Sequence, residues 1–164
     1  MDRTYFEDLD IGAISRIGTW RLDPDEVVSF ARRWDPQPFH VDEAAARSSI
    51  YGGLTASSLH LFAICTRLFF DHEEKIAVLA MLGKDAVRFP HPARVGEELV
   101  YETECIEKRP SSSKPDRGIV KLRDTLRDSK GEIVLSQEVS LLVARRTADS
   151  APPGSLGTEG DANE

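Results

Sequence analysis

Residues 54–71 of the chain are LTASSLHLFAICTRLFFD, and this stretch decides the fold. From residue 59 to residue 70 the leucine, isoleucine, phenylalanine, alanine and cysteine side chains surround a helix axis instead of forming one stripe. A helix that is apolar nearly all round is a buried one. At about 1.5 Å per residue it spans roughly 25 Å, the width of a small domain. The stretch therefore predicts a long central helix that the rest of the chain covers.

The chain beyond this helix has the composition of β-strands. Four segments are rich in Val, Ile, Leu and Thr with partial alternation, namely residues 86–89, 99–107, 118–127 and 132–144. The sequence Asp128-Ser129-Lys130-Gly131 is a strong turn signal, which joins the last two segments as a hairpin. Helices followed by hairpin-connected strands indicate the α+β class with an antiparallel sheet. We expect this sheet to wrap around the central helix and to leave its outer face and edges to a partner chain.

Two shorter helices are predicted before the central one. The first runs from about Pro24 to Arg33, with Asp23 as N-cap and Glu26 completing a capping box. Its buried face has i, i+3, i+4, i+7 spacing and contains Val27, Phe30, Ala31 and Trp34. The helix must end near Trp34, because Asp35 precedes a proline and is pushed out of the helical region. The second helix begins after Asp42, which caps the sequence EAAAR.

Length and composition narrow the class of protein. A chain of 164 residues is expected to form one domain, and its net charge of −7 argues against a nucleic-acid partner. It contains no run of about 18 uncharged apolar residues, so no membrane span is predicted. The N-terminal residues 1–12 are too charged to be an export signal. Cys65 and Cys105 lack the spacing of a zinc site or a disulfide framework, so we expect reduced thiols in a soluble, cytoplasmic protein.

The last part of the chain differs from the rest. Residues 147–164 contain almost no large apolar side chains, so they cannot bury enough surface to offset the entropy lost on ordering. We predict a folded domain over residues 1–146 and a disordered C-terminal tail over residues 147–164.

The first candidate for chemistry is Trp34 to His40, WDPQPFH, in which two prolines separate an aspartate from a histidine five positions later. Pro36 and Pro38 favour an extended path, and Asp35 and His40 can meet only if the loop curves. A capping aspartate and a packed histidine explain the same pattern structurally. The functional interpretation is an acid/base pair, because histidine titrates near neutrality and a carboxylate can orient its ring or hold a water.

The second candidate is Tyr51-Gly52-Gly53-Leu54 before the central helix. Two glycines at the start of a helix let the backbone approach a ligand, and free N–H groups there form a site for a developing oxyanion. A tight turn explains the two glycines equally well.

The remaining polar residues favour structural interpretations. His60 lies three positions after Ser57 and either faces the site or is a satisfied core histidine, whereas His72 and His91 are expected at the surface. The basic segment 108–117 either binds the phosphates of coenzyme A or is a solvated loop, the commoner case. Ser111, Ser112 and Ser113 have no evident base, so a serine nucleophile is disfavoured.

Three motifs in this order resemble one family. They are D-P-Q-P-F-H-x-D-E-x-A, then Y-G-G-L-x-A-S-x-x-H, then V-R-F-x-x-P-A-R-x-G-E-x-L, all within residues 5–146. Together they are similar to the MaoC-like dehydratases of the hot-dog fold, relatives of the (R)-specific enoyl-CoA hydratases. The resemblance implies a sheet wrapped around a central helix and a homodimer or higher homo-oligomer. It also implies an acyl-CoA substrate and no metal or other cofactor.

The resemblance also implies roles for particular residues. Asp35 and His40 match the pair that activates water, Gly53 matches the glycine whose N–H faces the thioester oxygen, and Ser57 falls near a family serine beside the site. The chain departs from the family at Gln37, where asparagine is usual, and at Gly52, where histidine is usual. These departures leave the pair intact and bear mainly on the substrate.

Three functions follow as alternatives. The first is an enoyl-CoA hydratase or 3-hydroxyacyl-thioester dehydratase. The second is an acyl-CoA thioesterase, although such enzymes normally place a carboxylate on or beside the central helix and residues 55–70 contain none. The third is a non-catalytic acyl-CoA-binding subunit of a hot-dog heterodimer, which binds without turnover.

Overall fold

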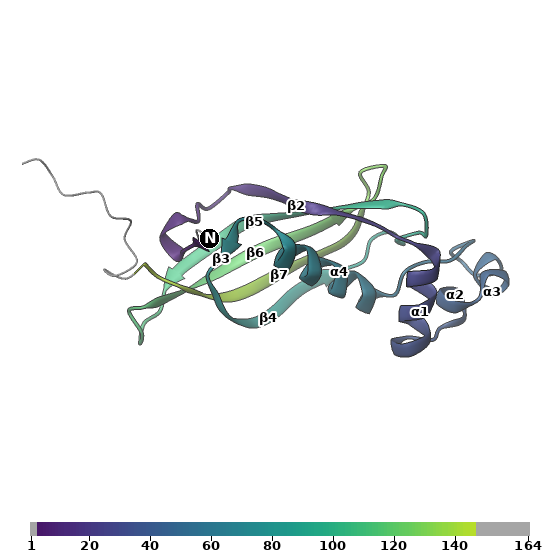
Figure 1. Ribbon diagram of the computed structural model, residues 1–164, viewed down its shortest axis with the longest axis horizontal. Helices are drawn as coiled ribbons and strands as arrows, with labels where there is room; N and C mark the ends of the chain where they lie inside the picture. Colours follow the sequence, from purple (N-terminus) through teal and green to yellow (C-terminus); the bar gives the residue numbers. More distant parts are fainter. Residues whose placement is uncertain (1–2, 147–164) are drawn as a thin grey trace, which may run out of the picture.

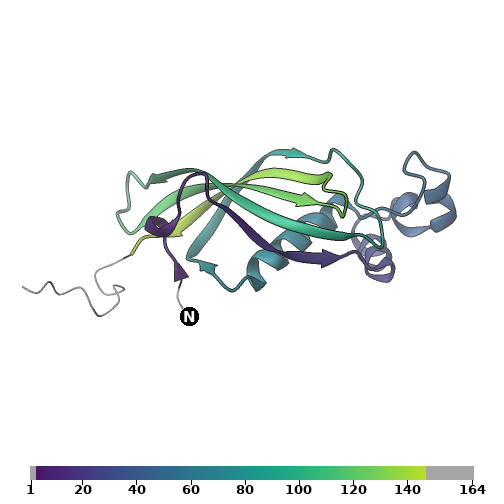
Figure 2. The ribbon, with the colours of Figure 1, turned by 90° about the horizontal axis from the view of Figure 1, so that it is seen from above.

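The computed structural model describes residues 3–146 and shows one curved antiparallel sheet with a helix against its concave face (Figure 1, Figure 2). The strand order is β2-β5-β6-β7-β4. The strands are β2 (Ile14–Arg21), β4 (Val78–Arg88), β5 (Glu98–Pro110), β6 (Arg117–Arg127) and β7 (Ile133–Ala144). The helix is α4 (Ser58–Asp71), and a short parallel pair of β1 (Arg3–Thr4) with β3 (Lys75–Ile76) stands apart from the sheet. The expected α+β class and the wrapped sheet are confirmed.

The core lies between α4 and the concave face of the sheet. Strands β5, β6 and β7 alternate buried with partly exposed residues along most of their length, so one face of each packs inward. The core contains Leu61, Ile64, Cys65 and Leu68 from α4 and Leu99, Tyr101, Leu126, Val134 and Leu135 from the sheet. Burial of this apolar surface is the main stabilising contribution to the domain.

Helix α4 is shorter and less completely buried than its sequence indicates. It begins at Ser58, with the Ser57 hydroxyl accepting from the N–H of Leu59, and not at Leu54. The preceding residues 54–56 pair instead with residues 93–95, since the N–H of Ala56 donates to the carbonyl of Ala93 at 2.8 Å. Leu59 and Phe70 remain 46% and 68% exposed, so one side of α4 is uncovered in a single chain.

The two strands that lie at the edges of the sheet were not predicted in full. β2 was missed, and β4 begins eight residues before the predicted segment 86–89. Both carry register shifts, β2 between Arg16 and Gly18 and β4 at three places along its pairing with β7. Such shifts interrupt the alternation by which a strand is recognised.

Three helices stand together at one end of the sheet (Figure 1). They are α1 (Pro24–Trp34), α2 (Pro38–Val41) and α3 (Glu43–Arg47). Asp23 and Asp42 are N-caps as predicted, accepting from the N–H groups of Glu26 and Ala45. The prediction of a capping box in α1 is wrong, because the Glu26 carboxylate contacts Trp20 and His60 instead of the backbone of Asp23. Trp34 is also not buried but 59% exposed, because it is the last residue of the helix.

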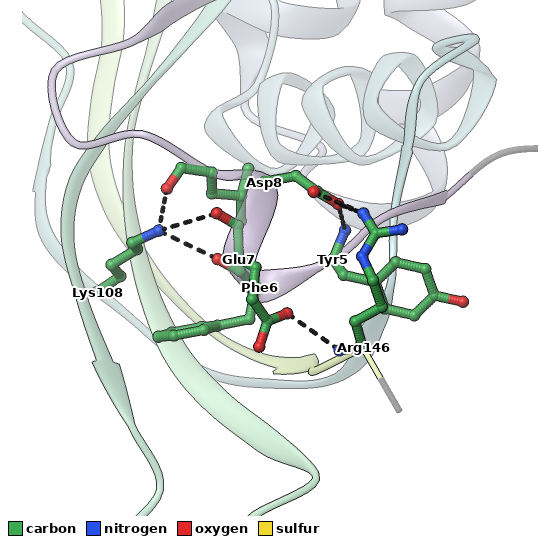
Figure 3. A network of polar contacts seen from close by, with 7 residues as sticks. Tyr5, Phe6, Glu7, Asp8, Lys108 and Arg146 are labelled. Atoms are coloured by element: carbon green, nitrogen blue, oxygen red, sulfur yellow. Dashed lines mark hydrogen bonds and ion pairs between the residues drawn. The ribbon is translucent and has the colours of Figure 1, made fainter. Parts of the chain in front are cut away.

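The N-terminal segment, which includes the 3-10 turn η1 (Phe6–Asp8), is hydrogen-bonded to the opposite end of the sheet. The Lys108 ammonium donates to the carbonyl groups of Phe6, Glu7 and Leu9, as Figure 3 shows. The Arg146 guanidinium donates to both carboxylate oxygens of Asp8 at 2.6 Å. Burial alone would raise the pKa of Asp8, but the hydrogen bonds from Arg146 and from the Tyr5 N–H outweigh it and lower the pKa. These contacts join residues 5–9 to the ends of β5 and β7.

Within residues 3–146 no helix is long and apolar enough to cross a membrane. The predicted disordered tail, residues 147–164, lies outside the described residues.

Candidate active site

Asp35 and His40 are brought together by the loop between them. Asp35 is the C-cap of α1, and its N–H donates to the carbonyl of Ala31 at 2.8 Å. The chain then turns back, because Pro38 opens the single helical turn α2 instead of continuing an extended path. The N–H of His40 donates to the Gln37 carbonyl at 2.9 Å within this turn. As a result His40 Nε2 lies 3.5 Å from Asp35 Oδ2.

The tautomer of His40 follows from its second contact. Nδ1 lies 2.6 Å from the carbonyl oxygen of Thr55, which can only accept, so Nδ1 carries the hydrogen. Nε2 is therefore the basic nitrogen of the neutral ring, and it faces the carboxylate of Asp35. The His40 side chain is 9% exposed and that of Asp35 is 25% exposed. The ring is fixed and the carboxylate reaches solvent.

Ser57 connects this pair to α4. Its hydroxyl donates to Asp35 Oδ2 at 2.7 Å and also accepts from the N–H of Leu59 as the N-cap of the helix. The side chain is almost completely buried. A serine has one hydrogen and two lone pairs, so both contacts are made at once. Ser57 therefore fixes the position of the Asp35 carboxylate relative to the central helix.

Gly52 and Gly53 lie in a turn and not at the start of the central helix. The expectation that they stand at the start of the central helix is wrong, because α4 begins at Ser58, five residues after Gly53. Gly52 has a φ of +67° and closes the turn with its N–H on the Ser49 carbonyl at 3.1 Å. Any oxyanion site at Gly53 therefore depends on its own N–H group.

Arg94 is a residue of this site that sequence reasoning missed. Its Nη1 donates to the carbonyl of Tyr51 at 2.5 Å, and a Cβ built on Gly53 would lie 3.9 Å from the same nitrogen. The guanidinium therefore holds the turn that contains Gly52 and Gly53. The signal in the sequence is the arginine of the segment P-A-R-x-G, which carried no assigned role.

An open cavity of about 560 Å³ lies over the pair. Its wall combines apolar or aromatic residues, such as Leu61, Phe89 and Val134, with polar ones. The polar residues are Asp35, Gln37, His40, Thr55, Ser58 and His91. Ligand pockets of roughly 300–1,000 Å³ combine mostly apolar walls with a few placed polar groups. The cavity has the size of a small-molecule site, and its wall is more polar than that of most such sites.

The other histidines lie elsewhere. His60 is 3% exposed, its Nε2 lies 3.1 Å from Glu26 Oε1, and its ring stacks on Phe30 at a centroid distance of 4.4 Å. It is a core histidine that joins α4 to α1. His91 is exposed at the rim of the cavity, where its Nε2 lies 2.9 Å from Glu132. His72 is the C-cap of α4 and is half-buried.

The basic loop and the cysteines add nothing to this site. The hairpin loop between β5 and β6 lies at the end of the sheet away from α1, α2 and α3 (Figure 1, Figure 2), so in one chain it does not meet Asp35 and His40. Cys65 and Cys105 are free and buried, and burial raises the pKa of the Cys65 thiol to about 12. Among residues 3–146 no cluster of three His, Cys, Asp or Glu side chains is arranged to hold a metal ion.

A five-stranded antiparallel sheet wrapped around one helix is the hot-dog fold, here in a single domain. The family described as the MaoC like domain matches residues 13–125. The chain belongs to this family of MaoC-like dehydratases and hydratases.

Three known proteins show the similarity in detail. The crystal structure of the MaoC-like dehydratase from Rhodospirillum rubrum matches with a TM-score of 0.81 and 36% identity, over 87% of this chain and 98% of that one. The uncharacterized protein YdeM of Bacillus subtilis is 26% identical over 85% of this chain and 98% of its own length. The mesaconyl-CoA hydratase of Haloarcula hispanica is 33% identical over 79 residues, which are 48% of this chain and 22% of that enzyme.

Proposed function

We propose that the protein adds water across the double bond of a trans-2-enoyl-CoA, or removes it from the corresponding 3-hydroxyacyl thioester. The observation that carries the proposal is the Asp35–His40 pair, held at 3.5 Å on the wall of an open cavity with a basic nitrogen facing a carboxylate. Membership of the dehydratase and hydratase family supports the same reaction. The mesaconyl-CoA hydratase among its relatives is named for a CoA-thioester hydration.

The geometry supports a definite sequence of proton movements. Water bound between Asp35 and His40 adds its oxygen to C3 of the enoyl group, and one proton of that water passes to Nε2 of His40. The electron pair of the C2–C3 double bond moves toward C2 and the thioester oxygen. Nε2 of His40 then delivers the proton that it took from water to C2, which completes the addition and returns the imidazole to its neutral form. Asp35 orients the water and stabilises the charged imidazole, and Ser57 keeps Asp35 in place.

The developing negative charge on the thioester oxygen needs a hydrogen-bond donor. We assign this role to the N–H of Gly53, in the turn that Arg94 holds through the Tyr51 carbonyl. Removal of such a donor typically costs about 10²–10³ in rate.

A thioesterase mechanism is less well supported. Within α4 no carboxylate occurs before Asp71, at the end far from the pair. The two carboxylates beside the helix are engaged by other side chains, Glu26 by Trp20 and His60, and Asp124 by Gln137. A non-catalytic binding subunit would need neither the fixed His40 tautomer nor the Ser57 contact to Asp35.

The protein is also proposed to act as a homodimer. Among residues 3–146, β4 lies at the edge of the sheet and pairs only with β7. Four large side chains on it are 36–52% exposed, namely Val78, Leu79, Met81 and Leu82. An apolar edge strand is a template for pairing with another chain. A second copy joined there would also approach the exposed side of α4. The cytoplasmic location expected from the sequence stays a prediction.

The deciding experiment follows the loss of enoyl-thioester absorbance over a panel of trans-2-enoyl-CoAs. Turnover with formation of 3-hydroxyacyl-CoA is the expected result. Release of free CoA would instead identify a thioesterase. Binding of the thioesters without any turnover would identify a non-catalytic subunit.

A further inference from the structure

The side chain of Arg94 makes fewer contacts than its chemistry allows. Nη1 donates to the carbonyl of Tyr51 at 2.5 Å. A guanidinium carries several further N–H donors, yet no second hydrogen bond and no ion pair of this side chain occurs among residues 3–146. Arg94 is half-buried. Because a cation partly removed from water without a carboxylate partner costs free energy, its charge has a cost that holding a turn does not explain.

The pocket around Arg94 contains carboxylates, but none of them pairs with it. The pocket has a volume of about 270 Å³, and its charged residues are His91, Arg94, Glu97, Asp128, Lys130 and Glu132. Asp128 accepts from the backbone N–H groups of Lys130 and Glu132, both at 2.9 Å. Glu132 pairs with His91 at 2.9 Å, and Glu97 forms no ion pair within the described part of the chain. The positive charge of Arg94 is therefore not neutralised by direct contact.

Arg94 lies beside the turn that contains the Gly53 N–H. A Cβ built on Gly53 would lie 3.9 Å from Nη1 of Arg94. The N–H of Gly53 has no acceptor among residues 3–146. In the proposed reaction, negative charge develops on the thioester oxygen at this N–H. A cation next to the donor attracts that charge, and the attraction is stronger in a partly buried site than in water.

The main chain of Arg94 fixes the other half of the site. It pairs with Thr55 in an isolated antiparallel bridge, and Nδ1 of His40 donates to the carbonyl of Thr55 at 2.6 Å. One residue therefore holds the proposed oxyanion donor through its side chain and the proposed general base through its backbone. A substitution of the side chain acts on the first of these, because backbone groups make the bridge.

We infer that Arg94 is a positioning residue of the reaction, and that its charge, together with its hydrogen bond to Tyr51, stabilises the negative charge that develops on the thioester oxygen at Gly53. The inference rests on the proposed function in one respect, that the thioester oxygen lies at the Gly53 N–H. A protein built in this way favours the enolate of an acyl thioester bound there, whether or not water is added.

The first measurement uses acetoacetyl-CoA, whose acidic C2–H yields an ultraviolet-absorbing enolate without any addition of water. When it is bound to the full-length wild type at a fixed pH, its ratio of enolate to keto form should exceed that of the free ligand. Arg94→Gln keeps an amide N–H for the Tyr51 carbonyl and removes the charge, so the ratio should fall about tenfold. Arg94→Lys keeps the charge and should retain more of the ratio than Arg94→Gln. A wild-type ratio in Arg94→Gln would overturn the inference.

Lys130→Gln is the matched control. It removes the same charge from the same pocket at an exposed residue, and the Lys130 side chain makes no hydrogen bond or ion pair among residues 3–146. Its enolate ratio should equal that of wild type. A fall in Lys130→Gln as large as that in Arg94→Gln would show that the net charge of the pocket matters and that Arg94 has no special place.

Rates of hydration give a second measurement. Arg94→Met loses both the charge and the hydrogen bond, so kcat should fall by about 10², as for the loss of an oxyanion donor. KM should change little, because Arg94 does not line the cavity that contains Asp35 and His40. Guanidinium ion at millimolar concentration fits the open pocket and should restore part of the rate of Arg94→Met, whereas urea should not. Equal losses of kcat in Arg94→Gln and Arg94→Met, with a lowered thermal midpoint and no restoration by guanidinium, would reduce Arg94 to a structural role.

The two measurements separate this inference from the proposed function. Turnover of enoyl-CoAs by wild type at a rate that Arg94→Gln retains in full would leave the hydratase in place and refute the role of Arg94. An enolate ratio that depends on Arg94, with no turnover of any enoyl-CoA, would support the role of Arg94 and refute the catalytic proposal.

Discussion

The hydroxyl of Ser57 donates a 2.7 Å hydrogen bond to Oδ2 of Asp35, the same oxygen that lies 3.5 Å from Nε2 of His40. One residue is thus the N-cap of the central helix and the anchor of the proposed catalytic carboxylate. This contact joins the C-terminus of α1 to the N-terminus of α4. Stability and the proposed activity are therefore coupled at Ser57.

Replacing Ser57 with alanine removes both contacts. We expect the free energy of unfolding to fall by about 1 kcal/mol for the lost cap, and the rate of hydration to fall because Asp35 is no longer oriented. Urea denaturation and enoyl-CoA kinetics measure the two effects. Ser29→Ala on α1 is the control, since this exposed side chain makes no hydrogen bond among the described residues and does not line the cavity. Equal rates in the two variants would show that Ser57 does not position Asp35.

Asp35→Asn and His40→Gln test the proposed pair directly. Each should lower kcat/KM for hydration by about 10²–10⁴, the range for loss of a general acid–base group. Thermal unfolding should show that both variants remain folded. Asp25→Asn, in the first turn of α1, and His72→Gln, at the end of α4, are the controls and should keep wild-type rates. Full activity of the Asp35→Asn variant would exclude Asp35 from the mechanism.

Asp124 should make the stability of the protein depend on pH. Burial raises its pKa in the folded state, so above about pH 4 the unfolded chain loses this proton first. The folded state then holds more protons, and stability falls as the pH rises toward the raised pKa. Asp124→Asn lacks this contribution, so its stability relative to wild type should increase over that window. Urea titrations of both proteins from about pH 4 to pH 8 measure the difference. A difference that stays constant with pH would mean that Asp124 titrates normally.

Gly118 on β6 is in close contact with the N-terminal segment. A Cβ built there would lie 2.4 Å from two carbon atoms of the Phe6 ring and 3.0 Å from the carbonyl oxygen of Arg109. Gly118→Ala should therefore cost about 1–3 kcal/mol of stability by overpacking. Gly83→Ala, with no atom within 4 Å of the added carbon, is the control. In a Phe6→Ala background the cost at Gly118 should shrink, and an unchanged cost would place the strain at the Arg109 carbonyl.

Substituting lysine for a leucine on β4 should dissociate the proposed dimer. Leu79 and Leu82 are 51% and 52% exposed in one chain, and a lysine at either position opposes the burial of that edge. Light scattering after gel filtration should change from the mass of two chains to that of one. Ile50→Lys is the control, since Ile50 follows α3 and is 94% exposed, and it should leave the mass unchanged. A monomeric wild type would exclude this mode of association.

Much of the fold follows from local sequence signals. The caps at Asp23 and Asp42 and the hairpin at residues 128–131 depend on neighbouring residues, and they form as predicted. The start of α4 was misplaced because residues 54–56 pair with residues 93–95, a contact that no local pattern reveals.

In the candidate site, too, local signals identified some residues, whereas contacts between distant segments could not be predicted. The spacing of Asp35 and His40 drew attention to them, but their approach depends on α2 and on the Thr55 carbonyl, which lies 15 positions beyond His40. Arg94 reaches Tyr51 across 43 positions, and Asp124 looked like one polar residue within a strand. Only the folded chain shows that its carboxyl group is buried beside an apolar cavity.

The contact between His40 and the Thr55 carbonyl has a consequence for biosynthesis. Thr55 is itself held by its bridge to Arg94, so the ring of His40 is oriented only after that distant segment has joined the fold. A nascent chain that has emerged only to residue 90 already contains Asp35, His40 and Ser57. It lacks the segment around Arg94 that pairs with Thr55. The proton-transfer geometry therefore arises late in synthesis, and an unfinished chain carries these residues without their arrangement.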